Sequence, residues 1–520
     1  MIVQLADYIQ HKFVKPNTVE HREYQVSLAE QAKSENCLIV LPTGLGKTTV
    51  ALHVIAHYLS LGVGGVLFLA PTRVLTNQHY DFLKNNLNLE DIGLVTGEDS
   101  IEKRRKNWSN SVICATPEIT RNDLDREIVS LDQFSLVIFD EAHRTVGDYA
   151  YSAIASRFVG KKTRIIGMTA TLPADKEKAT EIITTLQIAS VAQRNEESPD
   201  VAPYIQKTNT NWVKVELPKE MKEIQFYLRK ALEVRHTELT RCGLRLSFNV
   251  SLSQLLRARD FVLRQNRRAA KPLFTAIRLH YALNILEAHG VTSFLRFCDR
   301  TREKKGVGIN ELFQSDSNFL RALALAHDAQ KKGIEHSKIT KLAEIIKSIK
   351  GRAIVFTSYR DSVEVIHEKL LDLGISAGIL IGKAGETGLK QKQQVETVQK
   401  FRDGQYQVLI ATRVGEEGLD ISEVNDVIFF DNVPSSIRFI QRKGRTGRKS
   451  TGNLTVLIAK DTIDEAYYWV GQRKIKAAQS MGEKLTRDLQ KQSVPSLLVL
   501  MHIFRQSFDY VVTKLCFYRF

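Results

Sequence analysis

The sequence predicts an α/β protein in which two doubly wound parallel-sheet domains flank a helical insert. Three observations support this prediction: two groups of short apolar runs, a long stretch between them with apolar residues at helical spacing, and a length of 520 residues. A single core stops growing at about 250–300 residues, so this length requires several domains. We expect domains over 1–205, 206–340 and 341–490, followed by an apolar tail over 491–520.

The first group of apolar runs is rich in Val and Ile and does not alternate with polar residues. Strands that are buried on both faces of a parallel sheet have this pattern. Polar, often helical segments separate the runs, as the crossover connections of such a sheet require. We therefore expect strands at 37–41, 65–70, 111–115, 135–139 and 164–168.

The helical insert and the second sheet follow in order. Residues 210–340 carry apolar side chains at helical spacing, for example Leu252, Leu255, Leu256 and Leu263, and this spacing predicts helices. Apolar runs of the first type then return. They predict strands at 352–356, 408–411, 426–430 and 454–459.

The chain has the composition of an ordinary globular protein with a surplus of basic residues. Lys and Arg number 74 against 58 Asp and Glu, so the formal net charge is +16 and the pI is near 9.4. Such a balance is typical of proteins that bind a polyanion, although ribosomal proteins, membrane-surface proteins and plain solvated surfaces share it. The five scattered cysteines form no zinc or disulfide pattern. With neither a signal peptide nor a membrane-length apolar run, we expect a cytoplasmic protein without membrane association.

Basic residues are concentrated in the expected insert. Between positions 214 and 275 they outnumber acidic residues by more than two to one. Arg257, Arg264, Arg268 and Lys271 have the spacing of a single helical face if one helix runs through all of them. This face is expected to bind phosphates, and the alternative is a solvated helix surface.

A glycine-rich segment follows the first expected strand and precedes a helical pattern. Backbone N–H groups at such a position form an anion cradle, in which Lys47 can reach the β and γ phosphates and Thr48 can hold Mg²⁺. Leu41 stands where the strict phosphate-loop pattern requires glycine, so the segment matches a variant of that pattern. The loop residues are Pro42, Thr43, Gly44, Leu45, Gly46, Lys47 and Thr48.

Two acids stand at the end of the fourth expected strand. Asp140 and Glu141 follow an apolar run, and ligands of open α/β sheets bind at the carboxyl ends of strands. Asp140 suits a Mg²⁺ ion and Glu141 suits activation of the attacking water. A helix cap is the alternative for two such acids alone, but the preceding phosphate loop favours the catalytic interpretation.

A third motif, at 441–448 in the second α/β domain, contains alternating arginines and glycines. An arginine can neutralise charge that develops on a γ-phosphate, and Arg445 and Arg448 are the candidates. A solvated basic run or a localisation patch is the alternative. Gly444 and Gly447 between the arginines favour close backbone approach instead.

Taken together, the motifs resemble those of superfamily 2 helicases. The matching segments are 42–48, 70–73, 116–118, 140–143, 169–171, 355–358, 411–421 and 441–448, in the order of that family. Within it, the DEAH sequence at 140–143 and the long insert are most similar to the archaeal Hef helicase and its eukaryotic relative FANCM. The resemblance implies two RecA-like domains around a thumb-like insert, with ATP and Mg²⁺ as cofactors. It further implies ATP-driven remodelling of branched DNA with 3′ to 5′ movement.

The resemblance also implies roles for single residues. Gln25 would read adenine, while Gly415 and Asp420 would line the nucleotide site from the second domain. Backbone contacts to DNA would come from Arg73, Thr116 and Thr412, supplemented by Arg257, Arg264 and Arg268 of the insert. Coupling of ATP turnover to DNA would involve His143, Thr169, Thr171 and Gln441.

The chain departs from the family in lacking the acidic nuclease motif that many Hef relatives carry. We expect a helicase without built-in cutting, for which a sliding clamp or a separate nuclease is a plausible partner by analogy. A double-stranded-RNA-stimulated ATPase of the RIG-I type and a non-catalytic nucleic-acid scaffold remain as alternatives. The apolar tail over 491–520 matches nothing in the family; packing on the second domain, partner binding and an altered reading frame are its three interpretations.

Overall fold

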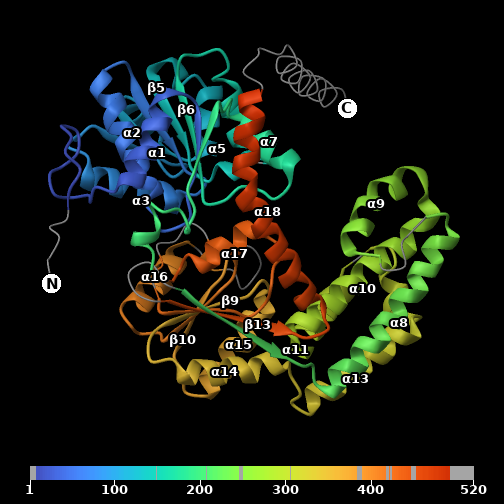
Figure 1. Cartoon of the computed structure of the whole chain (residues 1–520). Coiled ribbons are helices and arrows are strands. Elements are labelled where there is room, and N and C mark those ends of the chain that lie inside the picture. Colours follow the sequence, from blue (N-terminus) through green and yellow to red (C-terminus); the bar gives the residue numbers. More distant parts are fainter. Residues whose placement is uncertain are drawn as a thin grey trace. The chain divides into compact units, whose positions relative to one another are not determined.

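The structure, a computed structural model, divides the chain into two compact units. One unit contains the residues up to Ile205 together with those from Arg473 onward, and the other contains Gln206–Gln472. Figure 1 shows the elements of both. The structure describes residues 7–147, 149–206, 208–244, 250–304, 306–382, 389, 391–416, 421, 424–446 and 452–491.

The first unit is built on a seven-stranded parallel sheet with the strand order β3-β4-β2-β5-β6-β1-β7. All five expected strands are present. The sequence did not predict β3 and β7, which are four residues long and lie at the two edges of the sheet. The strands are β1 (Cys37–Val40), β2 (Gly65–Leu69), β3 (Ile92–Val95), β4 (Val112–Ala115), β5 (Phe134–Phe139), β6 (Arg164–Thr169) and β7 (Ser190–Gln193).

Both faces of this sheet are buried, as the unbroken apolar runs predict. In β1, Ile39 faces one core while Leu38 and Val40 face the other, because successive side chains of a strand point to opposite faces. The helices that cover the sheet are α1 (Glu23–Ser34), α2 (Lys47–Leu61), α3 (Arg73–Asn86), α4 (Ile101–Asn107), α5 (Pro117–Asp125), α6 (Tyr149–Ser156) and α7 (Lys176–Thr185).

The second unit contains a six-stranded parallel sheet with the order β10-β11-β9-β12-β13-β8. The strands are β8 (Thr208–Val215), β9 (Ala353–Phe356), β10 (Ala377–Leu380), β11 (Val408–Ala411), β12 (Asp426–Phe429) and β13 (Gly452–Ala459). The helices associated with this sheet are α14 (Ser337–Ser348), α15 (Arg360–Asp372), α16 (Gln391–Arg402), α17 (Ser436–Lys443) and the first part of α18 (Ile463–Lys491).

Two expected boundaries differ from the structure. Residues 208–215 were expected in the insert but form β8, which pairs with β13 along its whole length. The second domain was expected to extend to residue 490, but α18 belongs to the first unit from Arg473 onward, where Met481 and Leu485 join the core. The tail expected over 491–520 lies outside the described residues except for its first one.

The insert is helical, as predicted, and α8, α9, α10 and α13 gather in a lobe beside the second sheet (Figure 1). A single core joins the insert helices and includes Ala459 of β13, so the insert and the sheet form one unit. Within the described ranges, each helix is either too short or too polar to cross a membrane. The insert helices are α8 (Lys219–Arg241), α9 (Leu252–Gln265), α10 (Ala270–His289), α11 (Val291–Arg302), α12 (Ile309–Gln314) and α13 (Ser317–Lys331).

The single basic helical face predicted in the insert is wrong. Helix α9 ends at Gln265, and Asn266 leaves the helical conformation with φ −141° and ψ 62° while its side chain donates to the Cys242 carbonyl at 2.8 Å. Arg268 therefore lies in a short 3₁₀ turn and Lys271 in α10. Arg257 and Arg264 do share one face of α9, and both are exposed.

Ion pairs and hydrogen bonds attach the insert to the second sheet domain. Arg296 and Arg300 of α11 bind Glu364 at 2.6 Å and Asp361 at 2.7 Å, both carboxylates being on α15. The carboxylate of Glu287 on α10 accepts from the Ile463 N–H at 2.7 Å. Because these contacts join the insert to two helices of the second domain, we infer that the insert moves with that domain.

Candidate active site

The phosphate loop passes between β1 and α2, and its conformation requires glycine. Gly44 and Gly46 have φ of +91° and +79°, a region that glycine adopts without strain. Gly46 caps α2, so Lys47 and Thr48 begin the helix, and the N-terminus of the helix borders the loop. The Lys47 ammonium donates to the Leu41 carbonyl at 3.1 Å. Lys47 and Thr48 are thus held at a helix N-terminus, where backbone dipoles favour a bound anion.

Gln25 lies against the phosphate loop, although it is distant in sequence. Its amide nitrogen donates to the Leu45 carbonyl at 3.1 Å, and the Tyr24 hydroxyl donates to the same carbonyl at 2.8 Å. A Cβ atom on Gly46 would lie 2.4 Å from the Gln25 amide nitrogen, so glycine is needed for this packing. The Gln25 Oε1 atom is buried without a hydrogen-bond partner among the described residues. A purine amino group is the kind of donor that this oxygen lacks.

Asp140 follows β5 at the carboxyl edge of the sheet, as predicted. Its side chain is 6% exposed, and Oδ2 lies 2.8 Å from Nε2 of His79 on α3. Burial alone would raise the pKa of the Asp140 carboxyl, but the adjacent His79 and Lys47 outweigh burial and lower it. The carboxylate is therefore ionised and close to Lys47, which suits a ligand for a divalent cation.

Glu141 and three residues expected to couple hydrolysis to DNA lie together. The Glu141 carboxylate is 3.3 Å from Nδ1 of His143, and the same nitrogen is 3.1 Å from the Thr169 hydroxyl. Since that hydroxyl donates to the Thr171 carbonyl at 2.9 Å, it accepts from His143. The Glu141 backbone has φ +51°, a strained value for a residue other than glycine.

Two of the expected DNA contacts stand at helix starts of the first unit. Arg73 is the first residue of α3 and forms an ion pair with Glu98. Thr116 is the N-cap of α5 and is 9% exposed. Arg73 must therefore exchange its present partner to bind a phosphate, whereas Thr116 offers little more than its backbone and the edge of its hydroxyl.

The arginine motif of the second unit begins on α17. Gln441 is buried, and Arg445 donates to the Glu416 carbonyl at 2.7 Å. Arg442, which the sequence did not single out, is fully buried and lies 2.7 Å from the Glu416 carboxylate and 3.3 Å from Asp431. The guanidinium of Arg442 also lies 5.5 Å from two phenylalanine rings, those of β9 and β12. Arg442 therefore anchors α17 on its sheet, and Arg445 follows one turn later.

The remaining predicted residues of the second unit fall partly outside the described residues. Asp420 and Arg448 are among those outside. Thr412 is 8% exposed and directly follows β11. Gly415 passes close to that strand, since a Cβ atom there would lie 2.6 Å from the Ala411 Cβ. Thr412 and Gly415 thus stand at the carboxyl edge of the second sheet, the edge at which open α/β sheets bind ligands.

Sequence reasoning missed His79 and Glu416 as members of the site. His79 lies beyond the motif segment 70–73, and its contact with Asp140 joins residues 61 positions apart. Glu416 stands in the motif over 411–421, and its carboxylate accepts from both Arg438 and Arg442 at 2.8 and 2.7 Å. For Glu416 the available signal was a charged residue inside a recognised motif, close to the end of a buried strand. The contact of His79 left no such signal in the sequence.

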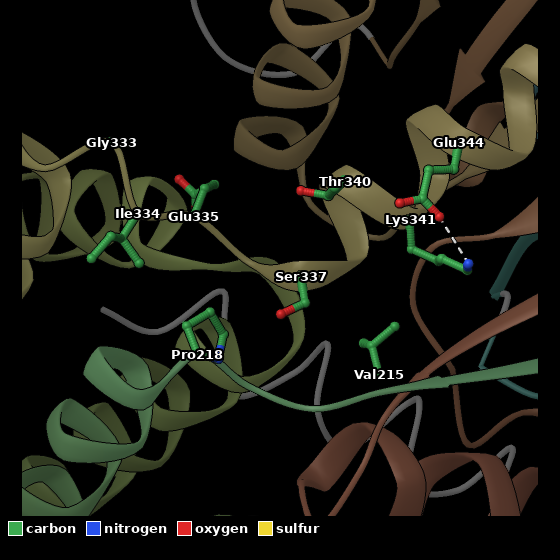
Figure 2. A pocket seen from close by; sticks show the side chains of 9 residues that line it. All are labelled: Val215, Pro218, Gly333, Ile334, Glu335, Ser337, Thr340, Lys341 and Glu344. Carbon is green, nitrogen blue, oxygen red and sulfur yellow. Dashed lines mark hydrogen bonds and ion pairs between the residues drawn. The ribbon is translucent and has the colours of Figure 1, made fainter.

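An open pocket of about 540 Å³ lies where the chain enters and leaves the insert (Figure 2). Val215 and Pro218 line it from the entering segment, and Gly333, Ile334, Glu335 and Ser337 line it from the leaving segment. Lys341 and Glu344 form an ion pair at its rim. None of the predicted site residues lines this pocket, so it is not the candidate active site.

Comparison with known proteins agrees with this geometry. Residues 22–179 match the family model of the DEAD/DEAH box helicases, and residues 337–450 match the helicase conserved C-terminal domain. The helicase domain of Hef from Pyrococcus furiosus has a similar structure, with a TM-score of 0.64 and 38% sequence identity. That alignment covers 86% of this chain and 97% of the Hef domain.

Two curated relatives extend the comparison. A Methanocaldococcus jannaschii protein, named as an ATP-dependent RNA helicase, is 37% identical over 481 residues, which are 89% of this chain and 60% of that protein. A mouse homolog of the Fanconi anemia group M protein is 32% identical, and the alignment covers 88% of this chain and 25% of that protein. The chain thus spans about a quarter to three fifths of these relatives. It belongs to the DEAD/DEAH box ATP-dependent helicases and, within them, to the family of Hef and the Fanconi anemia group M protein.

Proposed function

We propose that this chain is an ATP-driven motor that moves along DNA and remodels branched DNA such as stalled forks. One observation supports the proposal: Lys47, Asp140 and Glu141, the residue types that ATP hydrolysis requires, follow strands of the first sheet, and His143 links Glu141 to the segment at 169–171. A nucleic-acid scaffold without catalysis has no need for an ionised buried carboxylate beside a phosphate-loop lysine.

ATP binding is implied by the family, and the proposal assigns residues to it. Gln25 would accept from the adenine amino group, and the loop 42–48 would hold the phosphates. Thr48 and Asp140 would hold Mg²⁺, which when bound neutralises phosphate charge. Glu141 would take the proton of the attacking water. Gly415 and Asp420 would contribute to nucleotide binding from the second unit.

Arginines of the motif at 441–448 complete the catalytic part of the proposal. Arg445 and Arg448 would stabilise the charge that develops on the γ-phosphate, an effect worth roughly 10³ to 10⁵ in rate where it is known. Gln441, together with His143, Thr169 and Thr171, would make turnover depend on bound DNA. The buried anchor Arg442 supports this role, because it fixes the start of the motif on the second sheet.

DNA would be bound through its backbone. Arg73 would exchange Glu98 for a phosphate, and Thr116 and Thr412 would add contacts from the two sheet edges. Arg257, Arg264 and Arg268 of the insert are exposed and would hold the duplex arm of a branch. A relative named as an ATP-dependent DNA helicase supports DNA as the substrate, and the choice of branched DNA rests on the family resemblance. A sliding clamp or a nuclease as partner rests on analogy with the family.

A second candidate is an ATPase stimulated by duplex RNA, because the Methanocaldococcus relative is named as an RNA helicase. The rate of ATP hydrolysis separates the two. It would be measured without nucleic acid and with single-stranded DNA, forked DNA and duplex RNA, for the wild type and for Glu141→Gln. We expect strong stimulation by forked DNA that the variant loses. Stimulation by RNA alone would move the chain to the second candidate, and a lack of turnover would contradict the motor.

A further inference from the structure

A buried histidine of α3 contacts the carboxylate that is proposed to hold Mg²⁺. Nε2 of His79 lies 2.8 Å from Oδ2 of Asp140, and both side chains are less than a tenth exposed. An ionised carboxylate only accepts hydrogen bonds, so the Nε2–H group of His79 is the donor. A buried hydrogen bond to a charged acceptor is stronger than one between neutral groups.

The position of His79 is fixed from two sides. Its ring packs on Phe68 of β2 with centroids 4.4 Å apart, and β2 is the neighbour of β5, the strand that leads into Asp140. Between Arg73 and His79, α3 makes one and two-thirds turns and rises about 9 Å. The same rigid helix therefore carries an expected DNA contact at its start and the partner of Asp140 further along.

Two other features restrict the orientation of Asp140. Its backbone N–H donates to the Leu69 carbonyl at 2.9 Å, and its carbonyl accepts from the Tyr151 hydroxyl at 2.7 Å. These bonds hold the main chain, and the carboxylate itself also accepts a hydrogen bond from the Glu141 backbone N–H. The hydrogen bond from His79 engages Oδ2 and is the side-chain contact that, together with the Glu141 N–H, restricts where the second oxygen, Oδ1, points.

We propose that His79 is a positioning residue that orients the Asp140 carboxylate for Mg²⁺ and thereby connects α3 to the metal site. This inference rests on the proposed ATPase function and extends it, since none of the proposed catalytic roles involves His79. Hydrogen-bond partners behind a metal ligand typically change metal affinity or activity 10- to 100-fold when they are removed. A loss of that size is expected for a variant without the donor.

Four substitutions test the role. His79→Phe keeps the ring shape and removes the donor. In His79→Gln an amide nitrogen lies as many bonds from Cα as Nε2 does in histidine, whereas in His79→Asn it lies one bond closer. Asn77→Ala, an exposed position on the same helix, is the matched control.

The first readout is binding of a fluorescent ADP analogue, in EDTA and over a Mg²⁺ titration, without DNA. We expect the Mg²⁺ concentration needed for half-maximal enhancement to rise at least tenfold in His79→Phe and His79→Asn. His79→Gln is expected to stay within about threefold of the wild type, and Asn77→Ala to be unchanged. Equal affinity of all five proteins in EDTA shows that the nucleotide site is folded. The Mg²⁺ dependence of the ATPase rate, as a second readout, is expected to shift in the same order.

The outcomes separate this inference from the function on which it rests. If nucleotide binding by the wild type does not depend on Mg²⁺, both the proposed ATPase function and the role of His79 are overturned. A wild type with a clear Mg²⁺ dependence that His79→Phe shares would overturn the role of His79 alone. Failure of His79→Gln to the same extent as His79→Phe would also overturn it, because a restored hydrogen-bond donor would then not restore the response to Mg²⁺.

Discussion

The ammonium group of Lys338 lies 2.7 Å from the carboxylate of Asp464, and neither side chain is exposed to solvent. Lys338 stands in the first turn of α14, and Asp464 stands in the first turn of α18. Lys338 also donates to the Phe430 carbonyl at 2.9 Å, while Asp464 accepts from the Asn432 and Ala459 N–H groups. The pair thus ties the helix that follows the insert to the end of the second sheet.

The first prediction concerns this pair. Lys338→Met should destabilise the second unit by about 3–5 kcal/mol, because Asp464 is left as a buried charge without its cation. Lys341→Met, one turn later, removes an exposed ion pair with Glu344 and should cost less than about 1 kcal/mol. Urea unfolding of both variants checks the difference. The double variant with Asp464→Asn should recover part of the loss, and equal stability of the two single variants would contradict the prediction.

The second prediction concerns acid sensitivity. Burial lowers the pKa of His289 to about 4 and that of His336 to about 3. The contacts of His336 are consistent with a lowered pKa. Its Nε2–H group donates to the Glu287 carbonyl, and its Nδ1 atom accepts from the Lys338 N–H, which is possible only for the neutral ring. Below about pH 6.5 these two histidines are protonated in the unfolded chain but remain neutral in the folded chain. The contribution of the two histidines to the free energy of unfolding is therefore fully present above pH 6.5 and is lost as the pH falls toward 4.

The slope of this fall is measurable. Each such histidine contributes about 1.4 kcal/mol per pH unit in that window. We expect His289→Gln to be less stable than the wild type at pH 7. The difference between their free energies of unfolding should then decrease by about 1.4 kcal/mol per pH unit between pH 6 and 5. The free energy of unfolding at pH 7, 6 and 5 gives the answer. Parallel curves for the two proteins would contradict the prediction.

The third prediction concerns the phosphate loop. Gly46→Ala should weaken nucleotide binding at least tenfold, because φ +79° disfavours alanine and the new methyl group would displace Gln25. Gly62, which caps the other end of α2 with φ +65°, has open space around it. Gly62→Ala should therefore cost only about 1 kcal/mol of stability and leave nucleotide affinity unchanged. Titration with a fluorescent ATP analogue compares them, and equal affinities would be the contrary result.

The fourth prediction concerns the insert. Replacing Arg257, Arg264 and Arg268 together with alanine should weaken binding to forked DNA and lower the slope of log affinity against log salt by about 2 to 3. Arg259 pairs with Asp260 and points away from the shared face of α9, so Arg259→Ala is the control. Fluorescence anisotropy at several salt concentrations measures both slopes. An unchanged slope in the triple variant would exclude these arginines from phosphate contact.

Much of the fold follows from the sequence, because strands buried on both faces leave unbroken apolar runs. The strand at 208–215 was missed because it is an edge strand with partly exposed, alternating residues, and its polar Thr and Asn resemble a linker. Helix α9 has the expected periodicity, but its end at Asn266 depends on a contact with Cys242 of another helix. Such a contact has no local signal.

In the candidate site, too, some features have a local signal in the sequence and others depend on tertiary contacts. The positions of Asp140 and Glu141 could be predicted because they follow the end of a strand, and that of Lys47 because it follows a glycine-rich loop. The chemistry of each residue type then suggests its role. The contact between His79 and Asp140 could not, since it depends on the packing of α3 across β2 and β5. Likewise, burial of Arg442 between rings and carboxylates is a property of the assembled sheet rather than of the motif.

Strand separation on a forked DNA tests the central claim most directly. A fork with one fluorescent strand and a quencher on its complement reports release in real time, with ATP and Mg²⁺ added last. The motor account predicts release by the wild type that requires ATP and that Glu141→Gln, although it still binds the fork, does not perform. Release that proceeds equally without ATP, or equally in Glu141→Gln, would contradict the account.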